Sequence, residues 1–237
     1  MKTARLLIFL AIIILLIDLA YFYPKLTGTG KAVYEIKTAN MTRAIDGDTI
    51  ETDIGTIRLL GINTPEKKQD YYEDAKEFLK QYEGKEVEIE IHEKDKYNRT
   101  LGYVYFNNIL LNKEILQEGL ANLYVYDKDG YFSELEKSEK EAREQEKGLW
   151  KKSENYGCVE IVELKYTEET RCNNQEKLVL NNKCEKMNVT LKDSANHIYK
   201  IGLEKGIFEK NFSCVWNDDG DALLIRDDKG LVGYYSY

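Results

Sequence analysis

Short stretches of alternating apolar and polar residues dominate residues 32–106 and limit this part of the chain to a fold built mainly from β-strands. A period of two places the apolar side chains on one face of a strand, where they can be buried. Segments with apolar residues at helical spacing interrupt and then follow the alternation. This mixture, mostly β with α, predicts a small closed five-stranded barrel with three helices packed against it. The expected strands are 32–39, 48–53, 56–62, 85–94 and 100–106, and the expected helices are 72–82, 110–121 and 133–150.

The third helix has sequence signals at both ends. Ser133 is followed three residues later by Glu136, which predicts a capping box at the helix start. The helix is expected to end at Gly148, and the side chain of Trp150 beyond it is expected to pack against the core. We therefore expect the barrel domain to cover residues 32–152.

A second group of strands follows the boundary segment KKSENYG and includes no helix of useful length. Strand spacing predicts an all-β sandwich over residues 157–237. The stretch WNDDGDALLIRDDKGLVGYYSY resembles a lamin-tail-type, immunoglobulin-like domain, a class that serves in adhesion or targeting. Asp218, Asp219 and Asp221 are interpreted as a polar turn, and the partner of this domain is left open.

The N-terminus carries an apolar run between Arg5 and Pro24, with tyrosines near its far end. Its length approaches that of a membrane-spanning helix, so residues 1–24 are predicted to form an uncleaved signal anchor, with 25–31 as a linker. Lys2 and Arg5 precede the apolar run, which places the domains outside the cytoplasm by the positive-inside rule. Secretion after signal cleavage is the alternative.

Four charged residues, Asp48, Arg58, Glu66 and Arg99, suit phosphodiester hydrolysis. That reaction needs an oriented carboxylate and positive charge where negative charge gathers on the phosphate, and guanidinium groups bind phosphate oxygens in pairs. With only two histidines in the chain, carboxylates must carry proton transfer. The net charge of −8 argues against bulk attraction to nucleic acid but leaves room for a local basic cleft.

Several motifs occur together in one order: IDGDT, RLLGINTPE, DKYNR-x-LGYVY, QEGLA and a closing KSE…A…GLW helix. In this order and spacing, residues 32–151 resemble the thermonuclease (staphylococcal nuclease-like) family. The resemblance implies an OB-fold barrel and calcium-dependent cleavage of DNA and RNA. It also implies roles for individual residues. The implied catalytic residues are Arg58, Glu66 and Arg99, the metal ligands Asp48, Asn63 and the Thr64 carbonyl, and the substrate contacts Lys96, Tyr97, Tyr124 and Tyr126.

The chain departs from the family pattern at three places. Asn63 stands where the best-known members have a second metal-ligating Asp, so we expect weaker calcium affinity, which Asn63→Asp should tighten. The segment between Glu66 and the helix near Tyr72 is short, which leaves substrate-end preference open. One residue is missing before YVY, so Tyr124 and Tyr126 are alternatives for the same contact.

All four cysteines lie in the C-terminal part of the chain, at Cys158, Cys172, Cys184 and Cys214. An even number in an exported domain predicts two disulfides, with three possible connectivities. If the strands at 159–166 and 176–182 form a hairpin, Cys158 approaches Cys184 and leaves Cys172 for Cys214.

Two classes of function remain open at this point. The first is a membrane-anchored, monomeric nuclease acting on DNA or RNA. The second is a catalytically silent OB-fold barrel that binds nucleic acid or tethers a partner at the membrane surface. The presence of Glu66 beside Arg58 and Arg99 favours the enzyme, because a binding module has no need of a carboxylate beside phosphate.

Overall fold

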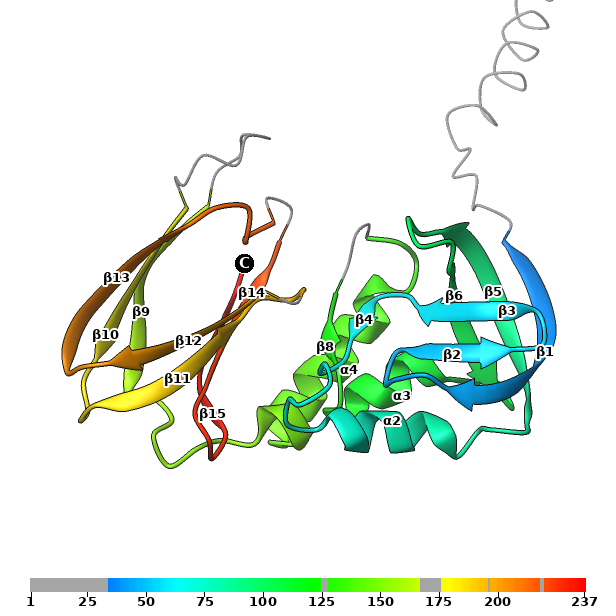
Figure 1. The fold of residues 1–237 in the computed structure, drawn as a ribbon, viewed down its shortest axis with the longest axis horizontal. Coiled ribbons are helices and arrows are strands. Elements are labelled where there is room, and N and C mark those ends of the chain that lie inside the picture. The colour runs from blue at the N-terminus through cyan, green and yellow to red at the C-terminus, as the bar shows by residue number, and fades with distance from the viewer. Residues whose placement is uncertain (1–33, 125–127, 167–175, 196, 218–219) are drawn as a thin grey trace, which may run out of the picture. The chain divides into compact units, whose positions relative to one another are not determined.

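The barrel closes through a parallel pairing between its two outer strands. In a computed structural model of the chain, which describes residues 34–124, 128–166, 176–195, 197–217 and 220–237, the sheet runs in the order β3-β2-β1-β5-β6-β7. Strand β3 also pairs with β6, with Arg58 opposite Leu101, and so completes a five-stranded barrel (Figure 1). The strands are β1 (Glu35–Ala44), β2 (Thr49–Thr52), β3 (Gly55–Leu59), β5 (Glu86–Lys94), β6 (Thr100–Phe106) and the short β7 (Ile109–Leu110).

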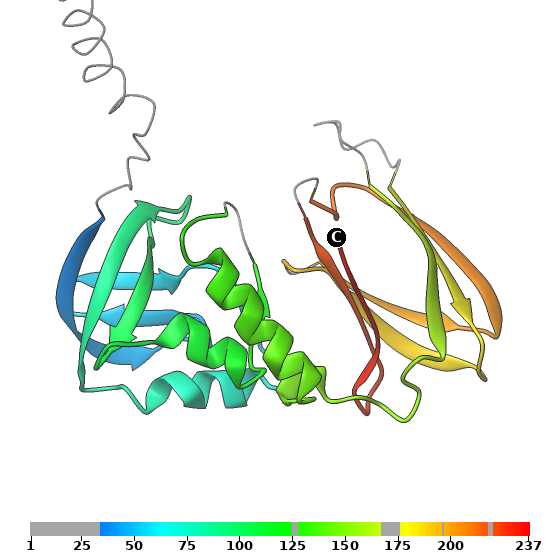
Figure 2. The ribbon, with the colours of Figure 1, turned by 180° about the vertical axis from the view of Figure 1, so that it is seen from behind.

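Three helices lie against the barrel: α2 (Tyr72–Lys80), α3 (Leu111–Gln117) and α4 (Phe132–Glu144) (Figure 2). Ala75 and Leu79 of α2 are fully buried in the same core as Ile50, Leu59 and Ile89 of the strands. A two-stranded ladder, β4 (Ile62–Asn63) with β8 (Asn122–Leu123), joins the loop before α2 to the segment after α3. The predicted OB-type barrel with three helices is confirmed.

The predicted capping box at Ser133 is wrong. Helix α4 begins at Phe132, its N-cap is Tyr131, and that cap has no side-chain hydrogen bond. Asp129 organises the entry instead, because its Oδ1 accepts a hydrogen bond from the Tyr131 N–H at 2.9 Å. The α-helix also ends at Glu144, earlier than expected, and a separate 3-10 turn at Gly148–Trp150 carries the buried Trp150.

The C-terminal part is built from two sheets that share a core. One sheet has the order β13-β10-β9 and the other β12-β11-β14-β15. Leu178 and Leu180 of the first sheet pack with Leu191, Leu223 and other apolar residues of the second. The strands are β9 (Val159–Lys165), β10 (Glu176–Asn182), β11 (Met187–Lys192), β12 (Ile198–Leu203), β13 (Gly206–Phe212), β14 (Ala222–Arg226) and β15 (Leu231–Ser236). The two-sheet arrangement agrees with the sandwich expected here, whereas β13 was not predicted from the sequence.

A disulfide joins Cys158 to Cys184, across the ends of the paired strands β9 and β10. This pairing matches the hairpin argument from the sequence. Cys214 is also disulfide-bonded, and its expected partner Cys172 lies outside the described residues. The predicted anchor, the linker and Tyr126 lie outside them as well. Within the described ranges, no helix is long and apolar enough to cross a membrane.

The barrel and the C-terminal sheets belong to one compact unit, Glu35–Tyr237. Trp150 and Ala142 form a buried cluster with Leu224 and Leu231. The main chain adds direct links, since Leu231 N–H donates to the Lys151 carbonyl at 2.8 Å and the Leu231 carbonyl accepts from Ser153 N–H at 2.9 Å. The C-terminal sheets are thus packed on the barrel as well as joined to it by the chain.

Candidate active site

The DGD motif forms the tight turn between β1 and β2 and directs Asp48 inward. Asp48 N–H donates to Asp46 Oδ1 at 3.1 Å, and the Asp48 side chain is buried. Gly47 is required at the centre of the turn, because a Cβ added there would lie 2.6 Å from the Cβ of Ala75. The DGD turn therefore supplies a buried carboxylate.

The Asp48 carboxylate is engaged by Arg58, Thr64 and Thr49, and the Thr49 hydroxyl donates to Oδ1 at 3.1 Å. Arg58 Nε lies 3.2 Å from Oδ1, while the Thr64 N–H and hydroxyl donate to Oδ2 at 2.9 and 3.0 Å. Strand register brings Arg58 to this place, since it lies directly opposite Thr49 in the β2–β3 ladder. Both charged side chains are about nine-tenths buried, which strengthens their interaction relative to a surface pair.

Asn63 joins this cluster from β4 and is itself buried. Its Oδ1 accepts a long hydrogen bond from Arg58 Nη2 at 3.4 Å. Its Nδ2 donates to the main-chain carbonyl of Ser194 at 3.2 Å and to that of Ala195. The two carbonyl acceptors identify the end of the amide that faces them as the NH₂ group, because only that group can donate a hydrogen bond.

The second arginine reaches the same end of the barrel through the β3–β6 pairing. Arg58 is opposite Leu101, and Arg99 precedes Leu101 by two residues along the neighbouring strand. Asp95 anchors the turn that carries Arg99: its Oδ2 accepts from Arg99 Nε at 2.7 Å. Burial raises the pKa of Asp95, but hydrogen bonds from Arg99 and the turn outweigh it and leave the pKa below its usual value. Arg99 is thus held in place with part of its side chain exposed.

Two of the expected substrate contacts, Lys96 and Tyr97, lie beside Arg99, whose guanidinium carbon is 5.5 Å from the Tyr97 ring centroid. Tyr97 is 69% exposed at the tip of the Asp95–Arg99 turn, with the Lys96 ammonium 5.1 Å from its ring centroid. Glu66 is exposed in the loop between β4 and α2, two residues after Thr64. Tyr124 extends the β4–β8 ladder, and its N–H donates to the Gly61 carbonyl at 3.0 Å.

The electrostatics of the DGD turn favour a bound cation. Burial, followed by the charge of Asp48, raises the pKa of Asp46 to about 6. Two carboxyl groups this close carry an unfavourable concentration of negative charge that a cation would relieve. Among the described residues, no cluster of three or more His, Cys, Asp or Glu is placed to hold a metal ion. A cation would therefore need neutral oxygen ligands as well as Asp48.

The available oxygens fit calcium, which takes carboxylate, amide and main-chain carbonyl ligands. Asp48 supplies the carboxylate, Asn63 an amide oxygen and Thr64 a main-chain carbonyl. Because the NH₂ of Asn63 is held by two carbonyls, its Oδ1 is the end that faces Arg58. The donor set is chemically suitable, with one negative charge where a two-Asp site would have two.

Three residues of this region were not identified from the sequence: Asp95, Asn122 and Lys192. Asp95 could have been found, since Asp side chains commonly accept hydrogen bonds from the main chain of the turn that follows them. Asn122 lies directly opposite Asn63 in the β4–β8 ladder. Lys192 is 70 residues further along the chain, and its Nζ donates to Asn122 Oδ1 at 2.9 Å. Only the three-dimensional structure brings these two residues to the site.

Comparison with known proteins identifies the family to which this chain belongs. The family model described as "Staphylococcal nuclease homologue" matches residues 56–152. A thermonuclease of Staphylococcus hyicus is 30% identical over 162 residues, covering 62% of this chain and 96% of the relative. The chain belongs to the staphylococcal nuclease family.

Two Bacillus subtilis relatives extend the comparison. The endonuclease YncB is 36% identical over 145 residues, which are 53% of this chain and 68% of that protein. The SPbeta prophage-derived endonuclease YokF is 35% identical over 136 residues, or 50% of this chain, which spans only 46% of the length of YokF. In the Staphylococcus hyicus comparison the match covers nearly the whole relative, so more than a third of this family member has no counterpart there.

Proposed function

We propose that this protein is a calcium-dependent nuclease that cleaves DNA or RNA. Membership of the staphylococcal nuclease family makes it a phosphodiester-hydrolysing enzyme. The observation that carries the proposal is the buried Asp48–Arg58–Thr64 cluster, with Arg99 directly before the strand that pairs with that of Arg58. A carboxylate and two guanidinium groups at one end of a barrel match the charges that phosphodiester hydrolysis develops.

Arg58 and Arg99 would bind the non-bridging oxygens of the scissile phosphate. Both side chains are held before substrate arrives, Arg58 by Asp48 and Arg99 by Asp95. Such preorganisation matters because the groups need not reorient as charge builds up on the phosphate. Glu66, exposed in the loop between β4 and α2, is the carboxylate that would orient the attacking water.

Asp48, Asn63 and the Thr64 carbonyl would hold the calcium ion. When bound, the ion supplies positive charge that stabilises the negative charge of the phosphate. The two histidines have other partners: His92 bonds with Glu90 and His197 with Asp193. This distribution supports Glu66 as the group that handles the proton.

A basic and aromatic groove beside α4 supports a nucleic-acid substrate despite the acidic composition of the chain. The cavity has a volume of about 980 Å³ and begins next to Tyr124 and Ser194. Two of its acidic residues, Glu139 and Asp221, are already engaged by main-chain N–H groups. Cationic and aromatic side chains are the usual lining of a single-strand groove. The lining includes Lys128, Lys137, Lys140, Arg143, Phe132, Tyr234 and Tyr237.

The location follows as a further proposal: the domains act outside the cytoplasm, held by an anchor at residues 1–24, or secreted if that segment is cleaved. The Cys158–Cys184 disulfide supports this, since such bonds persist mainly in oxidising compartments. Mass spectrometry of the native N-terminus distinguishes anchor from cleaved signal.

A plasmid-nicking assay on residues 25–237 tests the function. Cleavage should require calcium, stop with a chelator, and fall at least 100-fold in Glu66→Gln, which keeps the size of the side chain but removes its charge. The silent OB-fold module is the competing function. Binding of nucleic acid without cleavage, at every divalent cation tried, would support that module and contradict the nuclease.

A further inference from the structure

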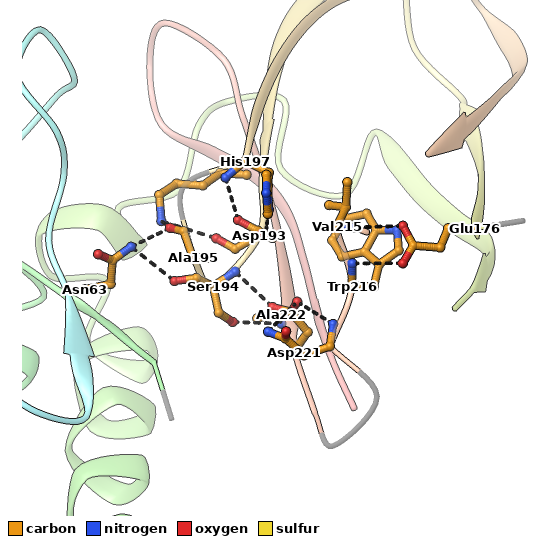
Figure 3. A network of polar contacts seen from close by, with 12 residues as sticks. Asn63, Glu176, Asp193, Ser194, Ala195, His197, Val215, Trp216, Asp221 and Ala222 are labelled. Atoms are coloured by element: carbon orange, nitrogen blue, oxygen red, sulfur yellow. Dashed lines mark hydrogen bonds and ion pairs between the residues drawn. The ribbon is translucent and has the colours of Figure 1, made fainter. Parts of the chain in front are cut away.

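The turn after β11 of the C-terminal sheets reaches the nuclease site. Its main-chain carbonyls at Ser194 and Ala195 accept both hydrogen bonds donated by the Asn63 amide (Figure 3). Asn63 and Ser194 are separated by 131 residues in the sequence. Asn63 therefore contacts the C-terminal domain through one end of its side chain and Arg58 through the other.

A second asparagine and a lysine complete this contact. Asn122, opposite Asn63 in the β4–β8 ladder, donates from Nδ2 to the same Ser194 carbonyl at 2.8 Å. Lys192 Nζ donates to Asn122 Oδ1 at 2.9 Å, to the Ala195 carbonyl at 3.0 Å and to the Asp193 carbonyl at 3.2 Å. Lys192 thus donates hydrogen bonds to both sides of the contact, to Asn122 of the barrel domain and to Ala195 of the C-terminal domain.

The C-terminal domain holds this turn in one conformation. Asp193 accepts hydrogen bonds from the main chain and ring of His197, at 2.9 and 2.6 Å. Ser194 N–H donates to Asp221 Oδ1 at 2.9 Å, and the Ser194 hydroxyl accepts from Ala222 N–H at 3.0 Å (Figure 3). The carbonyls that meet Asn63 are consequently fixed by the sheet behind them.

The surroundings of Lys192 agree with a role at the site. Burial lowers its pKa to about 8, while Asp193, Asp221, Asp48 and Glu66 act in the opposite direction. Its ammonium therefore lies within the field of two carboxylates assigned to the nuclease. Burying a cation is unfavourable unless its donors are satisfied, and here three oxygen acceptors satisfy them.

We propose that Lys192 is a positioning residue of the nuclease. It acts through the Ala195 carbonyl directly, and through the Ser194 carbonyl by way of Asn122, to keep the Asn63 amide oxygen turned toward Arg58. The inference rests on the proposed function, in which that oxygen is a cation ligand. It also gives a physical reason for asparagine at this position. An aspartate could not donate to the two carbonyls and would place negative charge against their oxygens.

Asn63→Asp is a poor test, because it changes the charge of the site and the domain contact together. The sharper test uses residues 25–237, which include the whole compact unit Glu35–Tyr237, with Lys192→Met, which keeps the length of the side chain and removes its donors. Lys200→Met, an exposed lysine on β12, is the matched control. Asn122→Ala breaks the same contact from the barrel side and decides the result if Lys192→Met does not fold.

The primary measurement is the NMR signal and hydrogen exchange of the Asn63 side-chain NH₂, without metal. We expect its exchange to accelerate about tenfold in Lys192→Met and in Asn122→Ala, since each loses hydrogen bonds that hold the turn. The control should match wild type. Unchanged Asn63 signals in folded Lys192→Met, or in Asn122→Ala where that variant decides, would overturn the proposal.

Nuclease kinetics provide the second measurement. Lys192→Met should lower kcat about tenfold with little change in KM, because the amide oxygen is misplaced while the phosphate-binding arginines remain. Equal kcat in Lys192→Met and Lys200→Met would count against the positioning role. If wild type shows no cleavage at all, the proposed function fails, while the amide measurement still decides whether Lys192 positions Asn63.

Discussion

The barrel and the C-terminal sheets both bury carboxylates, but they satisfy them differently. In the C-terminal sheets Glu176 accepts from the main-chain N–H groups of Val215 and Trp216, and Asp221 accepts from Ser194 and Asn217 (Figure 3). In the barrel, Asp48 faces the guanidinium of Arg58. A carboxylate held mainly by main-chain N–H groups stabilises a turn, whereas one that also pairs with a buried guanidinium group can take part in chemistry. Polar partners, more than burial, separate structural from functional carboxylates here.

The largest expected effect tests the barrel side of this comparison. Arg58→Ala should reduce kcat/KM by about 100-fold or more, because it removes one preorganised charge from the phosphate. Steady-state cleavage of a labelled oligonucleotide measures it. Arg43→Ala, whose exposed guanidinium pairs only with Glu51 among the described salt bridges, is the control and should cleave like wild type.

The second prediction tests the C-terminal side. Glu176→Gln should destabilise the fold by about 1–3 kcal/mol, since its amide can no longer accept both main-chain N–H groups as a carboxylate does. Urea unfolding measures the loss. At a temperature where the variant is folded, kcat should equal that of wild type; a large drop in kcat would show that this carboxylate is more than a cap.

Much of the barrel could be predicted from local sequence, because alternation sets which face of each strand is buried. The strand at 206–212 was not predicted, because its apolar residues do not alternate with polar ones. Ile207 and Phe208 are adjacent, and Ile207 is 67% exposed. The predicted capping box at Ser133 is absent because the helix begins at Phe132. Asp129, one turn before Ser133, accepts the hydrogen bond that organises this helix start.

The residues of the site also differ in whether local sequence could predict them. Asp48, Arg58, Glu66 and Arg99 lie within short motifs. Strand register then brings Arg58 next to β6, the strand that Arg99 directly precedes. The partners of Asn63 could not be predicted, because they are main-chain carbonyls more than a hundred residues away and carry no side-chain signature. The absence of a second Asp was visible in the sequence, whereas the contact of Asn63 with the other domain was not.

The third prediction concerns pH. Asp46 has a pKa near 6 in the folded protein, above its ordinary value of 3.8, so the folded state binds the proton more tightly than the unfolded state. Stability without metal should therefore fall as pH rises from about 4 to 6, and the loss is complete above that range. Asp46→Asn should be about 1–3 kcal/mol more stable than wild type at pH 7.5 and equal to it below pH 4. Unfolding with chelator across this range measures the gap; a gap independent of pH would contradict it.

The smallest expected effect tests whether the two domains share the substrate. Lys137 and Lys140 line the groove beside α4, and their ion pairs with Glu141 and Glu144 are long, at 3.7 and 4.0 Å. If both contact phosphates of a single strand, Lys137→Ala/Lys140→Ala should weaken binding several-fold and lower the slope of log affinity against log salt by about 1.4, or 0.7 per contact. Binding of a fluorescent oligonucleotide to the Glu66→Gln background measures this without cleavage.

The matched control for that experiment is Lys165→Ala/Lys210→Ala, which removes the same charge from β9 and β13, strands that do not line the groove. General electrostatic attraction would weaken binding equally in the two double variants, because both lose two positive charges. A strand lying in the groove would change the salt slope only in the α4 variant. Equal slopes would exclude the groove, which residues of both domains line, from the path of the substrate.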